Sequence, residues 1–210
     1  MTGAAWNGLL RIMEQAVPRT QPLSLPNLLT YARLVAVPMV AMVLFFMEGE
    51  GKNWLALGIF IAASITDFLD GYVARAWGQQ SPLGRMLDPI ADKLLVGATL
   101  MMLVGDQTIS GWSIWAALII LSREILVSGL REFLAELRVM VAVSRLAKWK
   151  TSVQMIAIGF LLAGDAGDAV CGCASSIGIL LLWAAALLTI YTGFDYFRAG
   201  LKYVISEQVQ

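Results

Sequence analysis

The chain alternates between long apolar stretches and short polar segments along most of its length. Six stretches are long enough to cross a bilayer, because a spanning helix needs about 20 mostly apolar residues. They lie at about 27–47, 54–77, 84–104, 112–135, 145–164 and 174–198. The polar connections between them are short, at 48–53, 77–82, 105–111, 136–144 and 164–174. The pattern predicts an all-α membrane protein in which residues 22–205 form one domain of six transmembrane helices.

The composition supports a membrane protein. Hydrophobic residues make up 59% of the 210 residues, charged residues make up only 14%, and the mean hydropathy is +0.74. A soluble domain has about 45–50% apolar and about 25% charged residues. We therefore expect the chain to contact membrane lipids and to have no nucleic-acid partner.

Two residue types narrow the possible chemistry. The chain has no histidine, which excludes an imidazole base and a Ser-His-Asp triad. Any metal should therefore be a hard ion that prefers oxygen ligands. Cys171 and Cys173 are the only cysteines, and we interpret this Cys-x-Cys pair as structural or incidental.

Residues 1–21 differ from the apolar stretches that follow. They include Arg11, Glu14 and Arg19 and have no long apolar run, so we expect no cleavable signal peptide. Apolar residues from Trp6 to Met13 recur at a spacing that suits one helix face. The segment is predicted to be an amphipathic helix that lies on the membrane surface beside the first span.

Basic residues are distributed unevenly between the two sides of the predicted bundle. Of the 15 Lys and Arg residues, all except Lys52 lie on the side of the termini or in the adjacent halves of the spans. Positively charged residues collect on the cytoplasmic side of membrane proteins. Both termini are therefore predicted to be cytoplasmic, which is consistent with an even number of spans.

Four aspartates lie inside the predicted second and third spans, where a charge is costly and usually marks function. Asp67 and Asp70 are three residues apart, and Asp88 and Asp92 are four apart, so each pair occupies one face of its helix. The connection between the two spans is short, so these faces can meet at one depth in the inner half of the membrane.

Four carboxylates in a medium of low dielectric repel each other strongly, unless some are protonated or cations neutralise them. Mg²⁺ and Mn²⁺ prefer carboxylate oxygens, and a pair of ions can assist an in-line displacement at phosphorus. Gly71 and Ala74 would leave a notch beside this face, although small residues also allow two helices to pack closely. A cation transporter is a remote alternative, because buried carboxylates can also bind a travelling ion.

The spacing of the aspartates and of the small residues beside them matches a known sequence pattern. The chain contains Asp67-x-x-Asp70-Gly71-x-x-Ala74-Arg75, followed by Gly84-x-x-x-Asp88-x-x-x-Asp92. This pattern resembles the signature of the CDP-alcohol phosphatidyltransferases. The segments 25–33, 123–136 and 144–155 are similar to the bacterial members of that family whose acceptor is glycerol 3-phosphate.

The resemblance implies a homodimer of six-helix subunits in the bacterial inner membrane, with the active site facing the cytoplasm. It implies a CDP-diacylglycerol donor and Mg²⁺ or Mn²⁺, as two ions. Asp67, Asp70 and Asp88 match metal ligands, and Asp92 matches a position that is both a ligand and a general base. The positions that match contacts to the donor are Asn27, Thr30, Asp67, Gly71, Ala74, Arg75, Ser81 and Gly84.

The expected reaction transfers the phosphatidyl group to sn-glycerol 3-phosphate and gives phosphatidylglycerophosphate and CMP. A dianionic acceptor needs cations, and the candidates are Arg123, Arg131, Lys148, Arg33 and Lys150. Internal pairing with Glu124 or Glu132, or anchoring of the lysines to lipid headgroups, would be the alternative roles. Inositol phosphate, serine and phosphatidylglycerol remain alternative acceptors.

Overall fold

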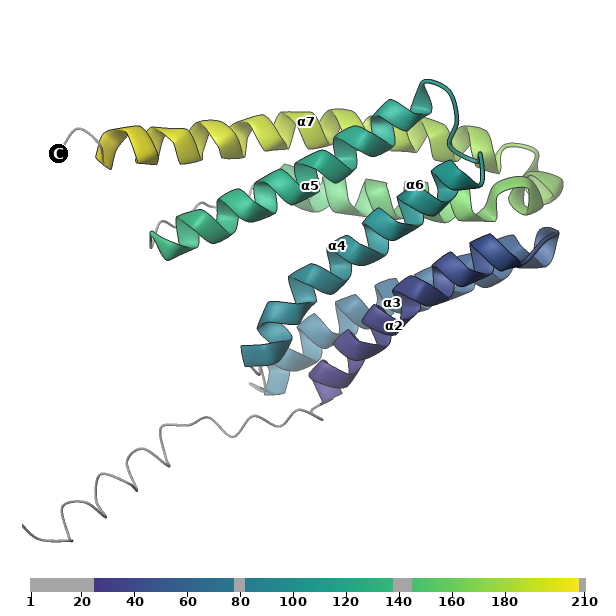
Figure 1. The fold of residues 1–210 in the computed structure, drawn as a ribbon, viewed down its shortest axis with the longest axis horizontal. Helices are drawn as coiled ribbons and strands as arrows, with labels where there is room; N and C mark the ends of the chain where they lie inside the picture. Colours follow the sequence, from purple (N-terminus) through teal and green to yellow (C-terminus); the bar gives the residue numbers. More distant parts are fainter. Residues whose placement is uncertain (1–24, 78–81, 138–144, 208–210) are drawn as a thin grey trace, which may run out of the picture.

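A computed structural model describes residues 25–77, 82–137 and 145–207 of the chain (Figure 1). The predicted amphipathic segment at residues 1–21 and the donor-binding candidate Ser81 lie outside these described residues. Within them every regular element is an α-helix, in agreement with the predicted all-α class. The helices, numbered as in Figure 1, are α2 (Leu25–Phe46), α3 (Glu50–Trp77), α4 (Pro82–Gly105), α5 (Ser113–Glu136), α6 (Arg145–Cys171) and α7 (Ala174–Glu207).

Each helix corresponds to one of the six predicted apolar stretches, with the ends of the stretches at 47 and 112 falling one residue outside α2 and α5. In the described part of the chain, four helices contain segments long and apolar enough to cross a membrane: Asn27–Phe46, Ser113–Glu136, Trp149–Cys171 and Ala174–Arg198. The other two, α3 and α4, carry the aspartates. Large apolar side chains such as Met101, Leu126 and Leu180 are exposed on the outside of the bundle. The chain is therefore a multi-pass membrane protein, because it combines several helices of spanning length with an apolar outer surface.

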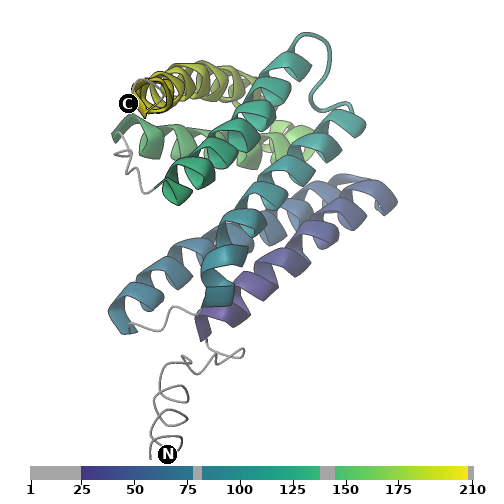
Figure 2. The same cartoon turned by 60° about the vertical axis from the view of Figure 1, so that its left-hand side comes forward.

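The helices form two groups of three (Figures 1 and 2). In the first group α2 packs against α3 and α4, and in the second α7 packs against α5 and α6. The groups meet where α3 contacts α6 and where α4 contacts α5 and α6. A continuous core of buried apolar side chains joins them, including Leu95, Ile120, Leu161 and Leu182. This arrangement brings α4, α5 and α6 together around one polar region.

The predicted connection at 164–174 is wrong for most of its length. Helix α6 continues to Cys171 after a kink at Gly164, where φ is 45° and ψ is −134°. Asn53 donates a hydrogen bond from Nδ2 to the Leu162 carbonyl over 3.0 Å, and its amide occupies the space beside Gly164. The Asp168 carboxylate accepts a hydrogen bond from the Ser175 amide over 3.0 Å, which links the end of α6 to the start of α7.

Cys171 is the last residue of α6, and Cys173 lies in the short turn that follows. Cys173 donates a hydrogen bond from Sγ to the Sγ of Cys171 over 3.6 Å, and no disulfide joins them. This hydrogen bond is the main reason that the pKa of the Cys173 thiol is raised. The thiol of Cys173 therefore stays protonated at neutral pH.

Lys52, the one basic residue predicted on the acidic side, has an acidic partner there. Its Nζ lies 2.7 Å from Asp106 Oδ1 and 2.9 Å from Asp106 Oδ2, so the start of α3 is tied to the end of α4. The pair closes the end of the bundle opposite the aspartates of the predicted site.

Candidate active site

Helix α2 supplies a partner to one aspartate on each of its two neighbours. Arg33 Nη1 lies 2.7 Å from Asp67 Oδ1 on α3. Thr30 donates a hydrogen bond from Oγ1 to Asp88 Oδ1 on α4 over 2.5 Å. Thr30 and Arg33 are three residues apart and share a face of α2, so this face brings the acidic parts of α3 and α4 together.

The Arg33–Asp67 pair is asymmetric in its exposure. The Arg33 side chain is completely buried, whereas 48% of the Asp67 side chain is exposed. A buried guanidinium needs a counter-ion, and Asp67 provides one while keeping an open side. Asp67 can therefore balance Arg33 and still present oxygen to a ligand.

Hard divalent cations fit the donor atoms of this region, because carboxylates are the ligands that they prefer. Among the side chains that the structure describes, no group of three or more His, Cys, Asp or Glu residues is close enough to hold a metal ion. Asp70 belongs to the helical backbone of α3, and its side chain lies outside the described part. The four-aspartate metal site is therefore untested and stays a prediction.

The fourth predicted aspartate, Asp92, lines a polar cavity of about 680 Å³ between α4, α5 and α6. The same cavity is lined by Arg123 and Arg131 from α5 and by Lys150 from α6. Three of the five predicted acceptor-binding cations thus surround one space together with the predicted general base. The lining is completed by Pro89, Lys93, Glu124, Val127, Ser128, Glu132, Thr151 and Ser152.

Some cations of the cavity already have acidic or polar partners. Lys150, which is almost fully buried, forms an ion pair with Glu124, and Arg123 Nη1 lies 3.7 Å from the same carboxylate. Lys93 donates a hydrogen bond to Ser128. The internal pairing of Arg123 with Glu124 that the sequence suggested is therefore present. Because the Glu124 carboxylate is shared between Arg123 and Lys150, it does not neutralise both cations.

Two residues of α7 contact the arginines, and the sequence did not single them out. Thr192 Oγ1 accepts a hydrogen bond from Arg123 Nη2 over 3.1 Å. Tyr196 Oη accepts one from Arg131 Nη2 over 3.4 Å. Their spacing of four residues is the signal that could have identified them, because it places both on one helix face.

The other predicted residues are placed as follows. Asn27 and Thr30 are buried near the start of α2, and Gly84 is buried in α4. Arg33 is at Asp67, outside the residues that line the polar cavity. Five further candidates lie in helices, but their side chains are outside the described part: Asp70, Gly71, Ala74, Arg75 and Lys148.

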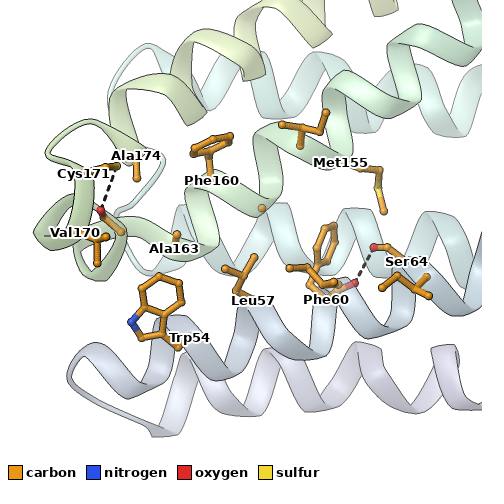
Figure 3. A pocket seen from close by; sticks show the side chains of 15 residues that line it. Trp54, Leu57, Phe60, Ser64, Met155, Phe160, Ala163, Val170, Cys171 and Ala174 are labelled. Atoms are coloured by element: carbon orange, nitrogen blue, oxygen red, sulfur yellow. Dashed lines mark hydrogen bonds between the residues drawn. The ribbon is translucent and has the colours of Figure 1, made fainter.

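A second, apolar groove of about 650 Å³ lies between α3 and α6 (Figure 3). It extends from Trp54 and Val170 at one end to Ser64 and Met155 at the other (Figure 3). Ser64 is one helical turn before Asp67, so the groove ends close to the acidic part of α3. The groove is open to the outside of the bundle, where Trp54 and Val170 are exposed.

Comparison with known proteins identifies the family to which this chain belongs. Residues 23–191 match the CDP-alcohol phosphatidyltransferase family, and the chain belongs to that family. It is 41% identical to the CDP-diacylglycerol–glycerol-3-phosphate 3-phosphatidyltransferase of Cereibacter sphaeroides, over 88% of this chain and 99% of the relative. It is 46% identical to the protein of the same name from Rickettsia bellii, over 86% and 97% of the two chains. A CMP-forming cardiolipin synthase of Oryza sativa subsp. japonica is 38% identical, over 92% of this chain and 62% of the relative.

Proposed function

We propose that this protein transfers the phosphatidyl group of CDP-diacylglycerol to sn-glycerol 3-phosphate, which gives phosphatidylglycerophosphate and CMP. The observation that carries the proposal is the cavity in which Asp92 lies with Arg123, Arg131 and Lys150. A carboxylate beside several cations suits an acceptor that brings both a hydroxyl group to be deprotonated and a phosphate to be held. The names of the bacterial relatives support the same donor and acceptor.

The acceptor reacts through groups that line this cavity. Arg123 and Arg131 bind its phosphate, and Asp92 receives the proton of its terminal hydroxyl group. The hydroxyl oxygen then forms a bond to the phosphorus that carries diacylglycerol, and the bond from that phosphorus to the CMP oxygen breaks. Asp92 later gives its proton to solvent, so no covalent intermediate with the protein is needed.

Donor binding belongs to the acidic faces of α3 and α4 and the start of α2. Asp67, Asp70, Asp88 and Asp92 would hold two divalent ions, Mg²⁺ or Mn²⁺, which neutralise the pyrophosphate and stabilise the charge that develops on CMP. Thr30 and Arg33 support Asp88 and Asp67 by the contacts described above. Asn27, Gly71, Ala74, Arg75, Ser81 and Gly84 are the proposed contacts to the CDP moiety.

The apolar groove between α3 and α6 suits one acyl chain of the donor. It is lined almost entirely by apolar side chains and ends one helical turn from Asp67. A lipid whose pyrophosphate lies at the aspartates could therefore extend a chain along the groove without leaving the bilayer (Figure 3). Van der Waals contact between the acyl chain and the groove would then help to keep the pyrophosphate of the donor at the aspartates.

The proposed membrane arrangement has six spans, α2 to α7, with the site and both termini on the cytoplasmic side of a bacterial inner membrane. The excess of Lys and Arg on that side supports this orientation. Residues 1–21 would lie along the same membrane surface, and two copies of residues 22–205 would form a homodimer.

The test is release of CMP by the purified protein from CDP-diacylglycerol in mixed micelles. With Mg²⁺ or Mn²⁺ present, glycerol 3-phosphate should support rapid release, and a chelator should stop it. Phosphatidylglycerol, serine and inositol phosphate are the comparison acceptors and should support less release than glycerol 3-phosphate. Rapid release with phosphatidylglycerol alone would instead favour the reaction named for the rice relative. No release with any acceptor would refute the proposal.

A further inference from the structure

Three neighbouring residues of α7, Thr192, Gly193 and Tyr196, form a surface against which both arginines of the cavity rest. We call these three residues the α7 shelf. They lie on one helix face, and Thr192 and Tyr196 are buried. The shelf does not line the polar cavity itself, so it acts on the cavity only through the side chains that rest on it.

Thr192 is arranged to accept, not donate, a hydrogen bond from Arg123. Its own hydroxyl donates to the Leu188 carbonyl over 2.8 Å, with the Thr189 carbonyl at 3.3 Å. The lone pairs of Oγ1 are therefore directed to Arg123 Nη2, 3.1 Å away. Gly193 allows this approach, because a Cβ atom at that position would lie 3.0 Å from Arg123 Cγ.

Tyr196 contacts both guanidinium groups at once. The Cζ atoms of Arg123 and Arg131 lie 6.0 Å and 5.5 Å from the centre of its ring. Its hydroxyl also accepts the hydrogen bond from Arg131. Two like charges repel each other, and the negative face of an aromatic ring offsets part of that repulsion. Tyr196 can therefore hold two arginines close together before any anion arrives.

We infer that Thr192 and Tyr196 position Arg123 and Arg131 as a pair, so that both guanidinium groups bind the same phosphate of the acceptor. This inference rests on the proposed function, because it assigns to the α7 shelf the selection of a phosphorylated acceptor. Holding the pair in place lowers the cost of ordering two long side chains when the acceptor binds. Tyr196 and Thr192 are positioning residues, and neither touches the acceptor.

The experiment measures KM for glycerol 3-phosphate and for CDP-diacylglycerol separately in a set of variants. Tyr196→Leu removes the ring and should raise KM for glycerol 3-phosphate about tenfold, the range of a desolvated cation–π contact. Tyr196→Phe keeps the ring and should recover most of this loss. Thr192→Val should also raise that KM, whereas Thr192→Ser should restore it. In each case KM for CDP-diacylglycerol should stay within about twofold of the wild type.

Tyr191→Leu is the matched control, because Tyr191 is an exposed tyrosine of the same helix. It should leave both KM values unchanged. Competitive inhibition by inorganic phosphate gives a second measure of the anion site and should weaken in Tyr196→Leu in parallel with KM for the acceptor.

Several outcomes would overturn the inference. A Tyr196→Leu enzyme with both KM values unchanged, or with both raised equally, would remove the positioning role. If that variant does not fold, Thr192→Val decides in the same way, because valine is nearly isosteric with threonine. Should the wild type prefer an acceptor without phosphate, the proposed function fails and the phosphate role fails with it. If the wild type is active with glycerol 3-phosphate and the variants keep its KM values, the proposed function stands and only the positioning role is refuted.

Discussion

Arg33 Nη1 lies 2.7 Å from Asp67 Oδ1, and the arginine is completely buried while the aspartate is half exposed. This contact joins α2 to α3 beside the predicted donor site. Removal of the exposed partner takes one counter-charge away from a buried guanidinium, whereas removal of the buried partner leaves a carboxylate that water can reach. The two halves of the pair should therefore differ in their effect on stability.

Asp67→Asn should lower the stability of the folded protein by about 2 kcal/mol, less than the ~3–5 kcal/mol of a fully buried pair because Asp67 is half exposed. Arg33→Met should cost less, since a flexible apolar side chain of similar length can replace the guanidinium. The double variant should be more stable than Asp67→Asn alone. Thermal unfolding in detergent measures all three, and equal losses for both single variants would contradict the asymmetry.

Arg123→Gln and Arg131→Gln should each raise KM for glycerol 3-phosphate by about 10- to 100-fold, because a hydrogen bond to a charged group is worth roughly 1.5–3 kcal/mol. KM for CDP-diacylglycerol should change little. Arg198→Gln is the control, because Arg198 is an exposed arginine of α7 outside the cavity lining. Steady-state kinetics with each substrate varied in turn makes the comparison. An equal rise for both substrates would argue against acceptor binding.

Asp92→Asn should lower kcat by about 10²- to 10⁴-fold, the usual contribution of a general base. Asparagine keeps the shape and an oxygen ligand but cannot accept the proton of the acceptor hydroxyl. The rate at saturating concentrations of both substrates and of Mg²⁺ is the quantity to measure. Asp165→Asn, at an exposed aspartate of α6, should have no effect. Near-normal turnover in Asp92→Asn would show that another group removes the proton.

Gly159→Leu should partly fill the groove between α3 and α6, where a Cβ atom at Gly159 would already contact Leu57. KM for a long-chain CDP-diacylglycerol should rise about fivefold or more, because each displaced methylene contact is worth ~0.8 kcal/mol. Short-chain donors and glycerol 3-phosphate should be affected less. Leu180→Trp, at an exposed position outside the groove, is the comparison variant. Equal kinetics with donors of all chain lengths would count against an acyl chain in the groove.

Gly164→Ala should destabilise the protein by about 1–3 kcal/mol, because the kink requires a positive φ that L-residues adopt at a cost. The added Cβ would also lie 2.7 Å from Asn53 Nδ2 and would weaken the hydrogen bond to the Leu162 carbonyl. Gly58→Ala is the control, because Gly58 lies in α3 with no atom within 4 Å of an added Cβ. Thermal unfolding should show a loss at Gly164 only, and equal behaviour of the two variants would contradict a strained kink.

The positions of the helices could be predicted from the sequence, because an apolar stretch of sufficient length is a local property. Each of the six predicted stretches corresponds to one helix of the structure, and none extends more than one residue beyond it. Asp67 and Asp92 lie on α3 and α4 as expected. The family could also be predicted, because its signature is a spacing within two neighbouring helices. The end of α6 could not, since the residues 164–174 have the composition of a loop. The kink at Gly164, from which the helix continues to Cys171, is contacted by Asn53, a residue of another helix.

What the sequence by itself determined is thus the set of helices, the charges on their faces and the family to which the chain belongs. The tertiary structure alone decided which charges meet. Arg33 pairs with Asp67 and does not line the cavity of Asp92. Arg123 and Arg131 donate hydrogen bonds to Thr192 and Tyr196, which are 69 and 65 residues away along the chain. Hydrophobic periodicity specifies which face of a helix is buried, but not against which helix it packs. Contacts between distant helices therefore appear only once the whole bundle has packed.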